Sequence, residues 1–130
     1  MKVKAEDRIK QLREIKENAL KGGGEKKIAI QHQKGKLTAR ERIDNLLDEG
    51  SFVEFNMLLD HLEGAPGDGI VSGYGTIDER IVCVYSQDPT IRGGSIGPLH
   101  GYRMYKTVEQ ALKMGVPFIG IHDSPGARLP

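Results

Sequence analysis

Two glycine-containing segments of the sequence could hold a ligand through their main-chain N–H groups. One is Gly93-Gly94-Ser95-Ile96-Gly97, and the other is the turn that contains Gly126 and Ala127. Glycine lets the main chain approach a ligand closely, and free N–H groups at a strand-to-helix turn favour negative charge. Such groups can stabilise an enolate or another oxyanion without a catalytic side chain. The alternative interpretation is that these glycines only form turns.

Side chains near these segments give weaker support for catalysis. Residues 93–97 fit the pattern Gly-x-Ser-x-Gly of a nucleophile elbow. The elbow requires a tight strand-to-helix turn, whereas a loop precedes Gly93, so we do not expect Ser95 to be a nucleophile. No metal site is predicted, because His32 has no second His or Cys nearby at ligand spacing. The acid–base residues on or beside both segments, which form no Ser-His-Asp arrangement, are Asp88, His100, His122 and Asp123.

Both glycine segments follow predicted strands. Residues 81–86 and 116–122 are short apolar runs that are typical of buried strands. Pro98 suits the first turn of a helix between them, and Gly115 suits its end. The apolar stripe of this helix comprises Leu99, Tyr102, Val108, Ala111 and Leu112.

A strand–helix–strand unit of this length favours a parallel pair of strands with a right-handed crossover. Both glycine segments would then leave the carboxyl ends of neighbouring strands. Ligands of open α/β sheets bind at that edge. The sequence therefore predicts an α/β fold with a ligand site formed by residues 93–97 and 126–127.

The first part of the chain is predicted to form an N-terminal helical arm. Residues 4–21 have the pattern of an amphipathic helix, which Gly22-Gly23-Gly24 ends. Residues 25–37 are basic, and we interpret them as a solvated surface, with a phosphate contact as the alternative. Residues 38–41, with the sequence Thr-Ala-Arg-Glu, form a capping box for a short helix that ends at Gly50.

The α/β body is predicted to follow this arm. Residues 51–56 alternate with a period of two, which indicates a strand. Residues 57–68 contain a loop. Residues 69–77 are predicted to form a strand that pairs with residues 81–86 in a hairpin.

The composition argues against several classes of protein. A chain of 130 residues suits one domain, and a net charge of +1 gives no signal for binding a polyanion. Trp is absent and aromatic residues make up 5% of the chain, which argues against nucleic acid binding by base stacking. Cys83 is the only cysteine, so no internal disulfide can form and a cytoplasmic protein is expected. We expect neither a membrane span nor a signal peptide.

Four stretches of the sequence match a known family in their order and spacing. They are residues 35–43 with 46–52, residues 67–75, residues 86–88 with 93–97, and residues 123–128. In these motifs the sequence resembles the N-terminal part of the carboxyltransferase subunit of biotin-dependent acyl-CoA carboxylases and decarboxylases, of the propionyl-CoA carboxylase β and methylmalonyl-CoA decarboxylase α type. Because the sequence stops at Pro130, directly after a glycine turn, we interpret it as a fragment of such a subunit.

The resemblance implies a crotonase-like fold, in which repeated ββα units build a superhelix. Residues 1–50 would be the helical arm. Residues 51–130 would be the truncated first part of the N-terminal acyl-CoA carboxyltransferase domain. The complete subunit would form a homo-oligomer.

The resemblance also implies an activity, which is transfer of a carboxyl group between carboxybiotin and a short-chain acyl-CoA such as propionyl-CoA or methylmalonyl-CoA. Carboxybiotin on a partner protein releases carbon dioxide, and the biotin anion removes the α-proton of the thioester. The resulting enolate attacks the carbon dioxide. The implied partners are biotin carboxyl carrier and biotin carboxylase subunits. The alternatives are the α subunit of a sodium-pumping methylmalonyl-CoA or glutaconyl-CoA decarboxylase, and an inactive CoA-binding fragment.

For the site, the resemblance places the N–H groups of Gly126 and Ala127 at the enolate oxygen. The family commonly has Gly-Gly where this chain has Pro125-Gly126. Proline has no N–H group, so position 125 cannot donate a hydrogen bond. The substrate-binding residues expected beside this turn are Gly93, Gly94, Ser95, Gly97, Lys36 and Arg40.

Overall fold

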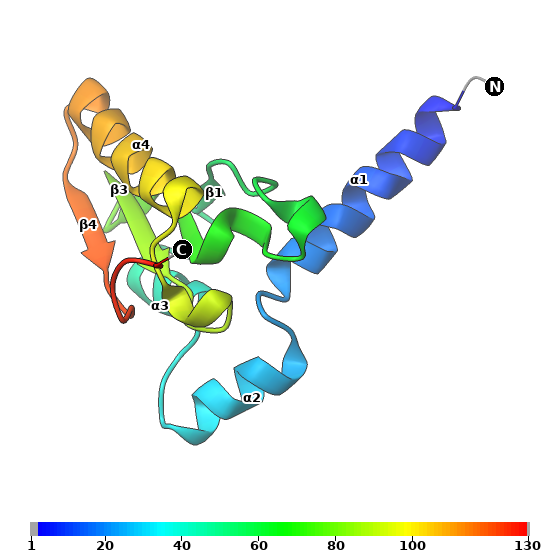
Figure 1. Ribbon diagram of the computed structural model, residues 1–130. Helices are drawn as coiled ribbons and strands as arrows, with labels where there is room; N and C mark the ends of the chain where they lie inside the picture. The colour runs from blue at the N-terminus through cyan, green and yellow to red at the C-terminus, as the bar shows by residue number, and fades with distance from the viewer. Residues whose placement is uncertain (1–2, 130) are drawn as a thin grey trace.

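The computed structural model describes residues 3–129 of the chain. Helices surround a four-stranded sheet, and the first helix extends away from it (Figure 1). The helices are α1 (Ala5–Leu20), α2 (Glu25–Gln33), α3 (Ala39–Leu46) and α4 (Pro98–Met114), with short 3-10 helices η1 (His61–Glu63), η2 (Pro66–Gly69) and η3 (Arg92–Gly94). The strands are β1 (Val53–Glu54), β2 (Ile70–Ile77), β3 (Arg80–Gln87) and β4 (Phe118–Ile121). Within residues 3–129, no helix is both long and apolar enough to span a membrane.

The strands lie in the order β1-β2-β3-β4. β2 and β3 form the predicted antiparallel hairpin, in which Ser72 pairs with Tyr85. β3 and β4 are parallel, and Ser86 pairs with Ile121 near their carboxyl ends. Since α4 connects these two strands, the predicted crossover unit is confirmed, and both glycine segments leave the same edge of the sheet (Figure 1).

The apolar face of the sheet packs against α3. Successive strand residues point to opposite faces, so Val82 and Val84 face α3, whereas the Cys83 side chain contacts Met114 at the end of α4. α3 therefore shares a core with the sheet, although the boundary predicted at residue 50 assigned it to the arm. The buried core residues on this side are Ala39, Ile43, Leu47, Val71, Val82 and Val84.

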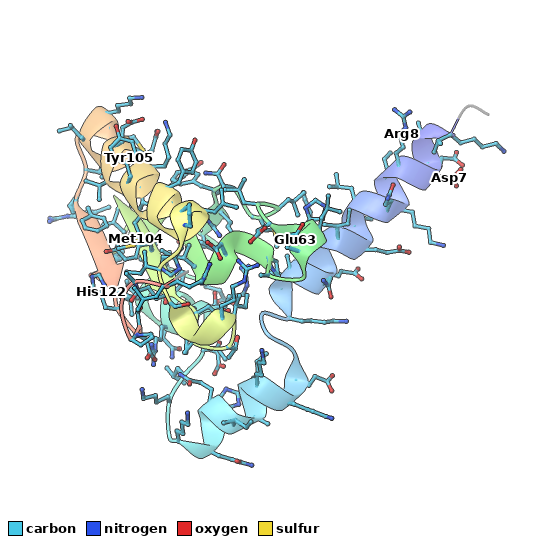
Figure 2. The ribbon with its side chains drawn as sticks, viewed as in Figure 1. Asp7, Arg8, Glu63, Met104, Tyr105 and His122 are labelled. Carbon is cyan, nitrogen blue, oxygen red and sulfur yellow. The ribbon has the colours of Figure 1, made fainter. Side chains whose placement is uncertain are left out.

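The apolar stripe of α4 is not its buried face. Most of the predicted stripe faces solvent: Tyr102 is 46% exposed, Val108 is 45% exposed and Leu112 is 81% exposed. Tyr105, which is labelled on the same helix in Figure 2, is 61% exposed. α4 turns its polar side inward because this face of the sheet and the η2 turn offer polar partners. The buried residues of α4 are His100, Arg103, Thr107 and Ala111.

Other differences are local. The basic residues 25–37 contain α2, which the charge pattern did not reveal, and the strand predicted at 51–56 is limited to β1. Two 3-10 helices lie in the predicted loop at 57–68. α3 ends at Leu46, and Gly50 lies in the following turn with a φ of 71°.

The linker between α1 and α2 packs tightly against the loop that follows β3. The N–H of Gly23 donates to Thr90 Oγ1 at 3.0 Å. A Cβ atom at position 23 would collide with the Thr90 carbonyl group, so only glycine fits there. Gly23 therefore does more than help to end α1, because it also lets the linker before α2 pack against the loop after β3.

Replacing Thr38 with alanine is expected to lower the free energy of unfolding by about 1 kcal/mol. The Thr38 Oγ1 accepts the N–H of Glu41 at 3.2 Å, and the Glu41 carboxylate accepts the N–H of Thr38 at 3.3 Å, which confirms the predicted capping box. Urea-induced unfolding of the 130-residue chain measures the loss. Thr38→Ser keeps the hydroxyl group and should restore most of the stability; equal losses in both variants would contradict the capping role.

Candidate functional site

The structure brings the two predicted glycine segments together. Ile96 and Ala127 form a parallel β-bridge. The N–H of Ile96 donates to the Gly126 carbonyl oxygen at 2.9 Å, and the N–H of Arg128 donates to the Ile96 carbonyl oxygen at 2.8 Å. The two loops therefore run side by side beyond the ends of β3 and β4, as the parallel topology predicted.

This bridge leaves the N–H of Ala127 available. Its neighbours Gly126 and Arg128 make both bonds to Ile96, so the polar groups of Ala127 itself point away from Ile96. No acceptor for the Ala127 N–H lies among residues 3–129. The N–H of Gly126 is instead engaged, because it donates to Ser124 Oγ at 3.0 Å. Of the two predicted oxyanion donors, Ala127 is the one available to a ligand.

The first glycine segment approaches the end of β4 closely. Gly93 and Gly94 have φ values of 65° and 75°, which other residues rarely adopt. A Cβ atom at position 94 would lie 2.6 Å from the Asp123 carbonyl oxygen. Glycine at this position therefore allows residues 93–97 to pack against the turn after β4.

The hydrogen bonds of Ser95 indicate a structural role in the loop and not that of a nucleophile. Its hydroxyl group donates to the Arg92 carbonyl oxygen at 2.7 Å and accepts from Arg128 Nε at 3.0 Å. Neither partner is a base. The hydroxyl group joins the first loop to the second, which supports the expectation drawn from the pattern of the sequence.

Changing Ser95 to alanine in the complete subunit is therefore expected to leave kcat within about tenfold, whereas losing a true nucleophile costs on the order of 10⁶-fold. The main-chain carbonyl of Ser95 keeps its own bond from Arg128 Nη2 at 3.0 Å, so the loop retains one connection. Steady-state turnover measures the effect. A loss of several orders of magnitude would restore the nucleophile hypothesis.

The two predicted histidines have structural partners. His100 is fully buried; its Nδ1 lies 3.0 Å from the Asp68 carbonyl oxygen and its Nε2 lies 3.3 Å from Gln87 Nε2. Burial lowers the pKa of the His100 imidazole, so the ring is neutral at pH 7. His122, just beyond the end of β4 in Figure 2, has its Nε2 3.1 Å from the Tyr85 hydroxyl group. Burial raises the pKa of Tyr85, so this hydroxyl group keeps its proton.

The two predicted carboxylates also hold the loops. Asp88 accepts the N–H of Thr90 at 2.9 Å and so stabilises its own turn. Asp123 pairs with Arg42 at 2.9 Å and with Lys36 at 3.6 Å. Burial opposes ionisation of Asp123, but the Arg42 bond and both cations outweigh it, so its pKa lies below the usual value. These contacts leave both carboxylates as anchors of the loops.

The structure separates the two predicted basic residues. Lys36 lies at the site, next to Asp123, and its side chain is half exposed. Arg40 does not reach the glycine loops in this structure, because its guanidinium binds both oxygens of Glu54, at 2.6 and 3.2 Å. It lines a cavity of about 560 Å³ beside α3 with Leu20 and Phe52. Lys36 is thus the better candidate for contact with a substrate.

Two residues outside the predicted site, Asp68 and Arg128, connect the loops. Asp68 is 1% exposed and pairs with Arg128 at 3.0 Å and with Arg92 at 2.6 Å. The sequence offered one signal, since both Asp68 and Arg128 lie in the motifs that carry the family resemblance. Those motifs gave no indication that the two side chains would meet.

The parallel β3–α4–β4 unit thus has an N–H without an acceptor among residues 3–129 where the chain leaves β4, and such a group can donate a hydrogen bond to an oxyanion. The chain belongs to the carboxyl transferase domain family, whose sequence profile matches residues 30–130. The crotonase-like α/β fold predicted from the sequence is confirmed by solved structures of carboxyltransferases.

The chain is similar to carboxyltransferase subunits of known acyl-CoA carboxylases and to a solved transcarboxylase. The propionyl-CoA carboxylase carboxyltransferase subunit of Haloferax mediterranei is 48% identical over 95% of this chain and 26% of its own length. The biotin-dependent acetyl-/propionyl-coenzyme A carboxylase beta5 subunit of Mycobacterium tuberculosis is 48% identical over 94% of this chain and 24% of its own. The hexameric transcarboxylase 12S, solved with methylmalonyl-coenzyme A bound, has a TM-score of 0.89 and 42% identity over 98% of this chain and 27% of that one. The chain thus spans about a quarter of the length of these relatives.

Proposed function

We propose that this chain is the acyl-CoA-binding part of a carboxyltransferase subunit. The complete subunit transfers a carboxyl group between carboxybiotin and a short-chain acyl-CoA such as propionyl-CoA or methylmalonyl-CoA. One observation carries the proposal: the N–H of Ala127, which has no acceptor among residues 3–129, lies next to the Gly93–Gly97 loop at the carboxyl edge of the parallel strands. The relatives supply the substrate class, because their names and bound ligands are those of acyl-CoA carboxylases.

The Ala127 N–H would donate a hydrogen bond to the thioester oxygen. Loss of the α-proton moves negative charge onto this oxygen as the enolate forms. A fixed N–H group stabilises that charge more strongly than it stabilises the neutral thioester, so it lowers the barrier to enolate formation. Carboxylation and decarboxylation pass through the same enolate, and the N–H therefore serves both directions.

Other residues of the site would bind and orient the substrate. The positive φ values at Gly93 and Gly94 keep the first loop close to the turn after β4, where the thioester would lie. Lys36 is half exposed and could meet a phosphate group of CoA as a point charge. The N–H of Gly126, the donor next to Ala127, is occupied by Ser124 in this structure. Ala127 consequently has the principal role.

The partners and the location follow from the same proposal. Biotin would be carried by a biotin carboxyl carrier protein and carboxylated by a biotin carboxylase subunit. The complete subunit would form a homo-oligomer, in keeping with the hexamer of transcarboxylase 12S. A cytoplasmic location is proposed on the ground that the only cysteine, Cys83, is a buried free thiol.

Exchange of a labelled carboxyl group tests the proposal. The complete subunit is mixed with its biotin-bearing partner and a panel of acyl-CoAs, and label is followed between biotin and each thioester. We expect exchange with propionyl-CoA or methylmalonyl-CoA and none with free CoA. The 130-residue chain alone should bind CoA weakly in calorimetry without turnover. Absence of exchange across the whole panel would refute the proposed activity.

A further inference from the structure

Asp68 is buried and contacts three separate parts of the chain at once. It belongs to η2, and its side chain is almost fully buried. One carboxylate oxygen, Oδ1, accepts from Arg92 Nη1 at 2.6 Å and from Arg128 Nη2 at 3.0 Å. The other oxygen, Oδ2, accepts the main-chain N–H of His100 at 3.0 Å.

Each of these three bonds reaches a different part of the site. Arg92 lies in η3, directly before Gly93. Arg128 directly follows Ala127, and its side chain returns to the first loop, where it bonds the Ser95 hydroxyl and carbonyl groups at 3.0 Å each. His100 lies in the first turn of α4. One carboxylate is therefore joined to the beginning and the end of the first loop and to the second loop.

The bond from the His100 N–H to Asp68 also caps α4, which has no side-chain cap of its own. α4 begins after Gly97, which has no side chain that could accept an N–H of the first turn. The carboxylate of Asp68 does so from a distant part of the chain. It thereby satisfies one of the free N–H groups at the N-terminus of α4.

The packing around this carboxylate leaves little freedom. A Cβ atom at position 97 would collide with the Arg128 guanidinium and lie 3.1 Å from Asp68 Oδ2. Burial disfavours the charged form of Asp68, but the His100 N–H and both guanidinium groups outweigh burial and keep its pKa below the usual value. Asp68 is therefore ionised at neutral pH and pairs with both arginines.

We propose that Asp68 is a positioning residue for carboxyl transfer: through Arg128 and the His100 N–H, its carboxylate sets the distance between the Gly93–Gly97 loop and the Ala127 N–H. It does not touch the substrate. The predicted effect of Asp68 on turnover rests on the proposed function. Its effect on the placement of the loops does not, because that placement can be measured without a substrate. A displacement of about 1 Å in such a site can cost on the order of 10²-fold in rate.

The matched control is Asp48, which makes a similar set of bonds far from the site. Its carboxylate accepts from Thr76 Oγ1 at 2.6 Å and from the N–H groups of Asp78 and Glu79 at 3.0 and 2.9 Å, at the turn between β2 and β3. Asp48→Asn should therefore perturb the fold without moving the loops. Asp68→Asn and Asp48→Asn are compared in the complete subunit with its partners.

Asp68→Asn should lower kcat by at least about tenfold and leave KM for the acyl-CoA within about threefold, because the lost effect belongs to the transition state. Asp48→Asn should leave kcat within about twofold at the same fraction of folded protein. Arg128→Lys keeps the charge but loses the fork that reaches both Ser95 and Asp68. The double variant Asp68→Asn with Arg128→Lys should be no slower than the slower single variant, since both changes break one connection.

Hydrogen exchange separates failure of this inference from failure of the proposed function. In Asp68→Asn, the hydrogen-bonded N–H groups of Ile96, Gly126 and Arg128 should exchange faster together, and in Asp48→Asn they should not. Unchanged exchange in Asp68→Asn, or a kcat that falls equally in both variants, would overturn the positioning role. If the wild-type subunit showed no turnover, the exchange result would still decide whether Asp68 holds the loops.

Discussion

Replacing Ala127 with proline in the complete subunit is expected to lower kcat by about 10² to 10³-fold, which corresponds to roughly 3 kcal/mol of transition-state stabilisation. The substitution removes an N–H of the turn that has no acceptor among the described residues. Affinity for the acyl-CoA should change by less than about threefold, because the bond strengthens only as the enolate forms. Steady-state kinetics and calorimetry with a nonreactive acyl-CoA analogue measure the two quantities separately.

The controls for this prediction separate the lost N–H from a distorted chain. Ala127→Gly keeps the N–H and should retain kcat within about threefold. Proline restricts the residue before it, and Gly126 has an unusual φ of 113°. Replacing Ala127 by lactic acid exchanges the N–H for an ester oxygen without that restriction and should reproduce most of the loss. Full activity of the ester variant would show that the oxyanion lies elsewhere.

A matching substitution at position 126 is less informative. The Gly126 N–H already bonds Ser124, and its φ lies far from the value near −65° that proline requires. Loss of activity in Gly126→Pro would therefore report a broken turn as readily as a lost donor. The sequence pattern does not distinguish the two residues as donors, and only the direction of each N–H separates them.

The topology of the site could be predicted from the sequence because it depends on local signals. Two apolar runs flank a helix that begins at Pro98 and ends at Gly115, where φ is 67°. Such a unit has one common arrangement, and that arrangement brings its two loops to one edge. The capping box at Thr38 was predictable for the same reason, since both of its bonds lie within four residues.

The buried face of α4 could not be predicted, because it depends on the groups that the sheet and η2 present to the helix. The spacing of Tyr102, Val108 and Leu112 indicates a helix, but the pattern does not say which face meets the sheet. The sheet side offers Ser72 and several main-chain carbonyl groups of η2 and β2. An arginine on α4 binds them, so the helix turns its polar face inward. The Asp68–Arg128 pair was missed for a related reason, since its partners lie far apart along the chain.

Arg103 is the residue that fixes this orientation of α4, and its contacts predict a large effect on stability. Its guanidinium is fully buried and donates to Ser72 Oγ at 3.0 Å, to the Phe55 carbonyl oxygen at 2.6 Å and to the Ile70 carbonyl oxygen. It also lies 3.4 Å from Glu54. Burial lowers the pKa of Arg103 to about 10, so the side chain still carries its charge at neutral pH.

Changing Arg103 to leucine should lower the free energy of unfolding by about 3 to 5 kcal/mol, because several buried acceptors lose their donor at once. Glu54 would keep its bonds from Arg40, so the cost comes mainly from the orphaned carbonyl and hydroxyl groups. Urea-induced unfolding of the 130-residue chain, followed by circular dichroism, measures the change. Lys113→Leu on the same helix is the control: its ion pair with Glu109 is exposed, and its loss should cost less than about 0.5 kcal/mol.

Arg103→Lys distinguishes charge from geometry. Lysine keeps the positive charge near Glu54 but cannot donate to Ser72 and the two carbonyl groups in one plane. If the fork holds α4 against the sheet, this variant should lose more than half of the stability that Arg103→Leu loses. If charge alone mattered, Arg103→Lys would be nearly as stable as the wild-type chain, and the polar face of α4 would then owe its inward orientation to something other than the guanidinium.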